Sequence, residues 1–200
     1  MTFRGRPAGI RSILTAWAAP VLVGVIAFGC SSTKHPAEPA STTKGAASTT
    51  APATDVHVTA ASFRSLKTMT AVRGFFVANL EGNLAGTLAV ANSKNGGVYP
   101  PGTLLQLVPQ EAMVKHRPGW NAQTKDWEFF FLDVSATGTK IVTRGVQQVV
   151  NRFGGNCASC HEAAQSKFDM VCEHDHGCAP LPIGDNVIRL VQLADPRPTT

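Results

Sequence analysis

Four of the five cysteines and three of the six histidines of this chain lie between Asn156 and Cys178. The segment begins with CASCH, in which Cys157, Cys160 and His161 have the spacing C-x-x-C-H. On one helical turn, residues i, i+3 and i+4 share a face, so two sulfurs and one imidazole would point the same way. The arrangement predicts one covalently attached haem c, with thioether bonds from both cysteines and His161 as the proximal iron ligand.

The N-terminus predicts export from the cytoplasm. Three arginines and no acid occupy the first eleven residues, and an apolar run of 16 residues follows at Ile13–Phe28. That run is shorter than the roughly 20 residues of a membrane-spanning helix. Cys30 follows Ala-Phe-Gly, which resembles a lipobox, so residues 1–29 are interpreted as a lipoprotein signal peptide and Cys30 as the lipidated residue. We therefore expect an extracytoplasmic lipoprotein anchored to a bacterial membrane.

Other chemistries use the same sulfur and imidazole groups. A redox dithiol also has the spacing of Cys157 and Cys160, but it needs a βαβ frame that the flanking sequence lacks. Two plain disulfides are a second alternative. A zinc ion is a third, with the same two cysteines and two ligands chosen from the residues that follow: Cys172, His174, His176 and Cys178. Export and the histidine directly after Cys160 favour haem, since exported thiols are normally oxidised or bonded to a cofactor.

With the first two cysteines bonded to haem, Cys172 and Cys178 are expected to form a disulfide with each other. Four side chains are candidates for a sixth iron ligand: His174, His176, Met113 and Met170. The simpler interpretation makes the two histidines surface residues of the disulfide loop and the two methionines core residues.

The rest of the chain divides into a tether and one domain. Residues 30–54 consist largely of Ser, Thr, Ala and Pro without any aromatic or large aliphatic residue, which predicts a disordered tether. Residues 55–200 are long enough for one domain with its own core. The formal net charge is +5, and removal of the signal leaves 15 basic and 13 acidic residues, a net of +2. No dense basic run is present, so nucleic acid is not an expected partner.

Strands in the middle of the domain and helices at its ends predict an α+β fold built on an antiparallel sheet, with a haem-attachment helix at CASCH. Residues 126–135 are the clearest strand and are expected to form a hairpin with residues 137–145. Residues 103–109 predict another strand, and residues 74–93 are ambiguous because helical spacing is interrupted by glycines. A helical turn is expected at 62–69 and a last helix at 186–194, capped by Asp185.

Three blocks in this order resemble the cytochrome P-460 family, which includes the cytochromes c-prime-beta. They are YPPGT at 99–103, DWEFFFL at 126–132, and CASCH with the Asp-containing segment after it, and the resemblance covers about residues 75–178. It implies a mainly antiparallel β domain with one pentacoordinate haem c. It also implies chemistry on small nitrogen species, either oxidation of hydroxylamine or binding of nitric oxide. The partners implied are a small nitrogenous ligand or substrate, a redox protein and the membrane, and a homodimer stays open.

The resemblance also suggests roles for side chains around the haem. An aromatic distal face is expected from four phenylalanines: Phe76, Phe129, Phe130 and Phe131. On a strand, at least one of the last three must point away from the other two. Glu128 and Asp133 are the candidate catalytic carboxylates, which would accept protons during hydroxylamine oxidation. Lys115 is the first lysine in the segment where P-460 enzymes carry a lysine crosslinked to the porphyrin, and without that crosslink gas binding or electron transfer is expected instead. Alternatives are an electron-transfer cytochrome or a zinc- or disulfide-stapled binding lipoprotein.

Overall fold

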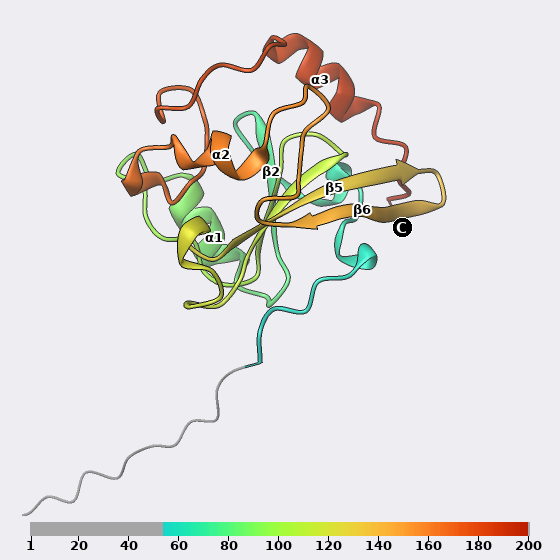
Figure 1. Ribbon diagram of the computed structural model, residues 1–200. Coiled ribbons are helices and arrows are strands. Elements are labelled where there is room, and N and C mark those ends of the chain that lie inside the picture. Colours follow the sequence, from blue (N-terminus) through green and yellow to red (C-terminus); the bar gives the residue numbers. More distant parts are fainter. Residues whose placement is uncertain (1–53, 200) are drawn as a thin grey trace, which may run out of the picture. The chain divides into compact units, whose positions relative to one another are not determined.

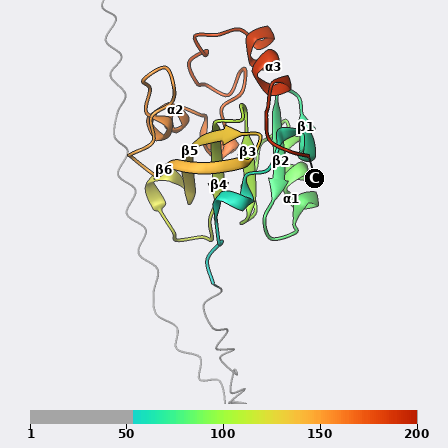
Figure 2. The same cartoon turned by 90° about the vertical axis from the view of Figure 1, so that its right-hand side faces the viewer.

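The computed structural model describes residues 54–199, which form an α+β domain (Figure 1). The signal peptide, Cys30 and all but the last residue of the tether lie outside the described residues. Six strands form one antiparallel sheet in which each strand pairs with the next in sequence (Figure 2). The strands are β1 (Thr70–Val72), β2 (Phe75–Asn79), β3 (Thr103–Gln106), β4 (Glu111–Lys115), β5 (Trp127–Ser135) and β6 (Gly138–Gly145).

Three α-helices accompany the sheet: α1 (Leu84–Ala91), α2 (Cys157–Glu162) and α3 (Asp185–Leu193). Four short 3-10 helices lie in the connections: η1 (Ala60–Ser62), η2 (Leu66–Thr68), η3 (Ala122–Thr124) and η4 (Ser166–Phe168). No helix within residues 54–199 is long and apolar enough to cross a membrane.

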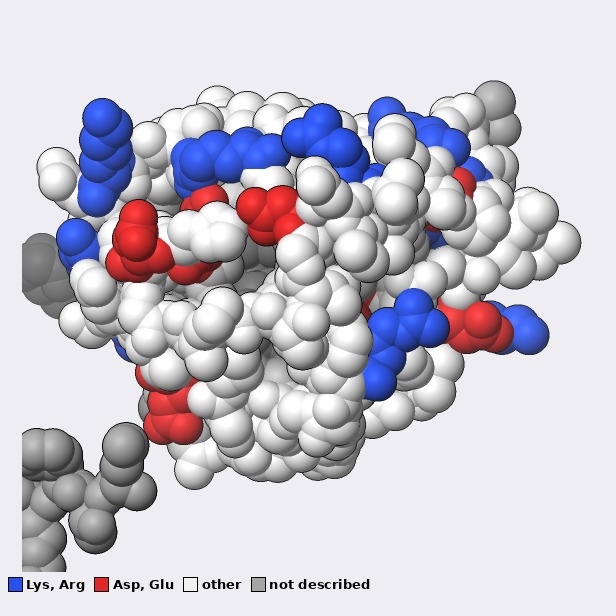
Figure 3. Space-filling model, turned by 90° about the horizontal axis from the view of Figure 1, so that it is seen from above, with Lys and Arg blue, Asp and Glu red and all other residues white. Residues whose placement is uncertain are grey.

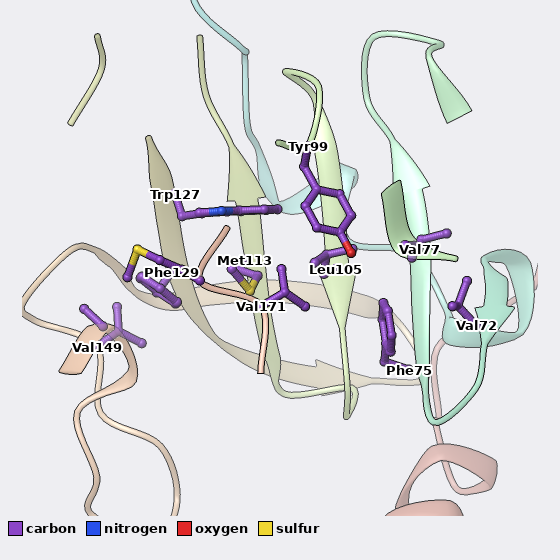
Figure 4. Close-up of a cluster of buried hydrophobic side chains, with 13 residues drawn as sticks. Val72, Phe75, Val77, Tyr99, Leu105, Met113, Trp127, Phe129, Val149 and Val171 are labelled. Atoms are coloured by element: carbon purple, nitrogen blue, oxygen red, sulfur yellow. The ribbon is translucent and has the colours of Figure 1, made fainter. Parts of the chain in front are cut away.

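Buried side chains lie on both faces of the sheet, because successive residues of a strand point to opposite sides. One face, which we call the α2 face, packs against α1, α2 and the segment after α2. Its cluster includes Met113, Trp127 and Phe129 together with Ala158 of α2 (Figure 4). The opposite face packs Phe130 and Leu132 against the first residues of the domain, including Val56 and Phe63. Strand β5 therefore contributes to two separate hydrophobic clusters.

Several of the predicted elements are present in the structure. The hairpin is present as β5 and β6, with Ser135 opposite Gly138, and the strand predicted from residue 103 is β3. The last helix is α3, but Asp185 is its first residue and Gly184 is its cap. Residues 74–93 contain both β2 and α1, so neither a single helix nor a single strand describes them. The expected turn at 62–69 is the 3-10 helix η2.

The segment after α2 is held close to the loop after α1. The backbone N–H of Gly97 donates to the carbonyl oxygen of Lys167 at 2.8 Å. A Cβ on Gly96, whose φ is +73°, would lie only 2.0 Å from that oxygen. A residue with a side chain could not come this close, so only glycine at position 96 permits the contact. The contact holds the segment after α2 against the loop after α1.

Candidate haem-attachment site

Helix α2 places the three residues of the C-x-x-C-H motif on one short turn. Asn156 caps it, since its Oδ1 accepts a hydrogen bond from the backbone N–H of Ser159 at 2.9 Å. The N–H of Cys157 donates to the carbonyl of Val149 at 3.0 Å, which ties the start of the helix to the chain before it. Cys157 and Cys160 are both partly exposed, and their sulfurs are not bonded to each other.

The His161 ring is held in the form that a metal ligand requires. Its Nδ1 lies 2.7 Å from the carbonyl oxygen of Met170, and because a carbonyl only accepts, Nδ1 carries the proton. Burial lowers the pKa of His161, an effect that the Met170 bond only partly opposes, so the neutral ring is favoured. The lone pair then lies on Nε2, which makes no hydrogen bond with any residue of the described domain. Haem-ligating histidines are oriented in this way, through a hydrogen bond from the other ring nitrogen.

The environment of Cys157 is unlike that of a redox dithiol. Burial, the charge of Glu111 and the neighbouring Cys160 together raise the pKa of its thiol to about 11. Redox-active cysteines need the opposite, a pKa lowered by positive charge or a helix N-terminus. The dithiol alternative therefore has no support from this site.

Phe129 forms the aromatic wall beside His161, with ring centroids 5.2 Å apart. Met113 lies opposite Phe129 in the pairing of β4 and β5, and Figure 4 shows both on the α2 face. Phe131 also packs against this cluster, whereas Phe130 points to the opposite face and contacts Phe63 with ring centroids 4.8 Å apart. The expectation that one of three consecutive phenylalanines points away is confirmed.

Phe76 also projects away from the site. Its neighbours Phe75 and Val77 both belong to the α2-face cluster, so the alternation of β2 directs Phe76 to the opposite face. Of the four phenylalanines expected around the haem, only Phe129 and Phe131 lie on the α2 face.

Glu128 is not brought together with His161, because it lies between two α2-face residues and points to the opposite face. Its carboxylate accepts hydrogen bonds from Arg144 at 2.7 and 2.8 Å and pairs with His116 Nε2 at 2.9 Å. Burial alone would raise the pKa of Glu128, but the bonds from His116 and Arg144 outweigh it and the pKa is lowered. Asp133, the other expected carboxylate, is exposed, and its side chain makes no hydrogen bond with the described residues.

Glu111 is a carboxylate on the α2 face that the sequence analysis did not select. It pairs with Phe131 and alternates with Met113 and Lys115 along β4, so all three share one face. Burial raises the pKa of Glu111, partly offset by the backbone N–H and charge of Arg152. The period-two spacing of EAMVK is the signal that would have identified it.

Lys115 is buried in an ion pair. Its Nζ donates to both carboxylate oxygens of Asp169, at 2.9 and 2.8 Å, and to the carbonyl of Lys125 at 2.6 Å. The two side chains are only 5% and 3% exposed. The three N–H groups of the ammonium thus have protein acceptors.

The three sequence blocks behind the family resemblance meet at Asp169. Its carboxylate accepts the backbone N–H of Tyr99 at 2.9 Å, and its carbonyl accepts Nε1–H of Trp127 at 2.7 Å. Tyr99 begins the YPPGT block, Trp127 belongs to DWEFFFL, and Asp169 is the acid in the segment after CASCH.

Cys172 and Cys178 form a disulfide, as expected, with their Cα atoms 5.7 Å apart. This bond removes both sulfurs from any zinc site, and no three His, Cys, Asp or Glu side chains within residues 54–199 are placed to hold one metal ion. His174 is highly exposed, while the ring of His176 stacks on Phe168 at 3.5 Å with its Nδ1 bonded to the Val171 carbonyl. Both histidines thus lie in the disulfide loop and its surroundings.

Comparisons of the chain with protein-family models, with curated proteins and with solved structures find no match. The chemistry of the site therefore follows from the side chains that it contains. Two unbonded thiols and an imidazole with a free Nε2 lie on one helical turn, beside the apolar wall of Phe129, Phe131 and Met113. These residues fit a haem c, which needs two thioether carbons, one nitrogen ligand and an apolar surface for the porphyrin.

Proposed function

We propose that this protein is an exported, lipid-anchored monohaem c-type cytochrome that acts on small nitrogen species such as nitric oxide or hydroxylamine. Cys157 and Cys160 hold the haem through thioethers, and His161 is the proximal ligand. One observation carries the proposal: the partnerless Nε2 of His161 lies on the same turn as two unbonded cysteines, in a domain whose other two described cysteines are oxidised. In an oxidising compartment, such a pair of thiols needs another bonding partner.

Membership of the cytochrome P-460 family, with its c-prime-beta relatives, is part of this proposal. Its support is the order of the three sequence blocks and their contacts at Asp169. When bound, the haem supplies an iron that exchanges electrons and takes a small ligand at its open position.

The side chains of the α2 face favour ligand binding or electron transfer over hydroxylamine oxidation. Phe129 and Met113 present an apolar wall that excludes bulky or strongly hydrated molecules. Glu128 is fully engaged on the opposite face, and the Lys115 ammonium is occupied by Asp169 and Lys125. Glu111 is the acid that remains on this face, and its raised pKa keeps it more readily protonated than an exposed glutamate.

A second candidate function is electron transfer by a six-coordinate haem. Met113 favours it, because this buried sulfur-containing side chain lies on the α2 face opposite Phe129. For a redox partner, the surface viewed in Figure 3 carries small groups of both charge signs around largely uncharged areas. Docking there would depend on apolar contacts more than on one dominant charge.

The test is production of the full chain with a haem c maturation system, followed by a pyridine haemochrome spectrum. A c-type band supports the proposal, and a colourless protein contradicts it. Rapid binding of nitric oxide or cyanide to the purified protein supports an open iron position. A six-coordinate spectrum with a sulfur ligand would favour electron transfer, and Met113→Leu should then open the site.

Export and lipidation have a separate test. The Cys30→Ala variant should leave the membrane fraction, whereas wild type should remain there and carry acyl chains detectable by mass. Equal partition of wild type and variant would contradict the lipid anchor without bearing on haem attachment.

A further inference from the structure

The carbonyl that orients His161 belongs to an unusual stretch of backbone. Asp169 and Met170 are consecutive non-glycine residues with φ of +52° and +65°. L-residues avoid this left-handed region, and a Met there is rarer than an Asp. Such a conformation persists only where the surroundings determine it.

The surroundings here are the contacts of Asp169. Lys115 Nζ binds both carboxylate oxygens, the Tyr99 N–H binds Oδ2, and Trp127 Nε1–H binds the Asp169 carbonyl. These donors come from β4, from β5 and from the loop before β3, so the turn is fixed to the sheet from three directions. The ammonium also lies 5.1 Å from the centre of the Trp127 ring.

The consequence of this turn is the direction of the next carbonyl. Met170 presents its oxygen to His161 Nδ1 at 2.7 Å, nine residues further along the chain than the histidine. No other described residue makes a hydrogen bond with that nitrogen. If the turn relaxed to ordinary φ values, the Met170 carbonyl would rotate away and His161 would lose the bond that selects its tautomer.

We propose that the buried Lys115–Asp169 ion pair is a positioning device for His161. It holds the left-handed turn at residues 169 and 170, and the turn directs the Met170 carbonyl at His161 Nδ1, which keeps Nε2 unprotonated and aimed for ligation. Lys115 thereby acts through Asp169 and Met170, as a positioning residue rather than as a group bonded to the porphyrin. That the orientation of the His161 ring serves to ligate iron rests on the proposed function, whereas the orientation itself does not.

The simpler alternative is that the pair only contributes to folding. A buried ion pair can often be replaced by neutral groups without loss of fold, whereas removing one partner leaves an uncompensated charge. The informative variant is therefore the double substitution Lys115→Met with Asp169→Asn. Asn tolerates the left-handed region, and its side-chain oxygen can still accept the Tyr99 N–H. Lys125→Gln is the matched control, because Lys125 Nζ donates to the carbonyl of Ser166 in the same segment from an exposed position.

The readout is solvent exchange of the His161 Nδ1 proton in the ¹⁵N-histidine-labelled full chain. With haem attached, the ferrous carbon-monoxide form is used because it is diamagnetic. Wild type and Lys125→Gln should show a protected Nδ1 proton. In the double variant, exchange should be at least about tenfold faster, the effect of losing one hydrogen bond, or the Nδ1 proton should move to Nε2.

A folded double variant with wild-type protection would overturn the proposal, and so would an unprotected Nδ1 proton in wild type. If the double variant does not fold, Lys115→Gln with Asp169→Asn gives the same comparison, because it keeps a polar group at each position and leaves no uncompensated charge. Haem content by intact mass is recorded on each sample. A wild type without haem but with a protected Nδ1 proton would contradict the proposed function and leave the positioning role standing.

Discussion

Both faces of the sheet hold paired polar groups, Glu128 on one and Lys115 on the other, but within the described domain His161 Nε2 and two cysteine thiols beside the α2 face are left without partners. On the face away from α2, Glu128 is paired with His116 and Arg144, and His116 Nδ1 pairs with Asp55 at 2.8 Å. On the α2 face, His161 Nε2 and the thiols of Cys157 and Cys160 have no bonding partner among the described residues. The first set is explained by folding alone. The second set lacks such partners, and the proposed haem site rests on that difference.

The largest effect should come from the two pairs of cysteines. The double variant Cys157→Ser, Cys160→Ser should lose covalent haem completely, because no thioether can form. The double variant Cys172→Ser, Cys178→Ser should keep the haem and lose about 2 kcal/mol of stability, since its disulfide closes a short loop. Haem staining on a denaturing gel checks the first result and urea unfolding the second. Haem retained after loss of the first pair would contradict the account.

Phe129 and Phe130 are neighbours in β5 that face opposite ways, so they form a matched pair. Both are almost fully buried, and each change to Ala should cost about 3–5 kcal/mol in unfolding free energy. Only Phe129→Ala should change the rate at which nitric oxide binds to the ferrous protein, because only that ring packs beside the proposed proximal ligand His161. Equal effects of the two variants on ligand binding would refute the assignment of faces.

Glu128 and Glu111 offer a contrast between a carboxylate bonded to two side chains and one whose pKa is set mainly by burial. Glu128→Gln should destabilise the domain by about 3 kcal/mol, since it removes a buried charge bonded to two partners. Glu111→Gln should be within about 1 kcal/mol of wild type, because burial already disfavours its charge. Urea unfolding at pH 7 measures both. A larger loss at Glu111 than at Glu128 would show that the networks have been assigned to the wrong faces.

The smallest effect is the pH dependence of the same two variants. The pKa of Glu128 is lowered in the folded protein, so its stabilisation is present above its ordinary value of 4.5 and is lost as pH falls through its folded value. The difference in unfolding free energy between wild type and Glu128→Gln should therefore become smaller in acid. The pKa of Glu111 is raised in the folded protein. The unfolding free energy of wild type should therefore rise relative to that of Glu111→Gln as pH falls toward 4.5. Unfolding curves from pH 7 down to about pH 2 test both signs, because the Glu128 window lies below 4.5 and the Glu111 window above it.

The sequence was sufficient to predict the α+β class, the β5–β6 hairpin and the disulfide, because each has a local signal. Strand β4 was missed because its EAMVK sequence places Glu111 and Lys115 toward a packed face, where charged residues usually argue against a buried strand. Lys115 is tolerated on that face because its ammonium pairs with the carboxylate of Asp169. That partner lies 54 residues further along the chain. No sequence pattern near Lys115 predicts a partner so far along the chain.

For the candidate site, the sequence predicted the helical turn that carries its three residues but not their surroundings, and haem attachment stays a prediction. Cys157, Cys160 and His161 follow from spacing alone, and helix α2 places them on one turn. Glu128 was chosen for its position beside three phenylalanines, but the alternation of β5 directs it to the other face. The contact of the Met170 carbonyl with His161 could not be predicted from the sequence. The direction of that carbonyl depends on two residues that are left-handed although neither is glycine.

The intact mass of the full chain, produced alongside a haem c maturation system and measured under denaturing conditions, tests the central claim most directly. The account predicts one population heavier by a single haem, with the added mass on the peptide that contains Cys157 and Cys160. A polypeptide of unmodified mass across residues 157–161, from cells that mature a known c-type cytochrome normally, would contradict it.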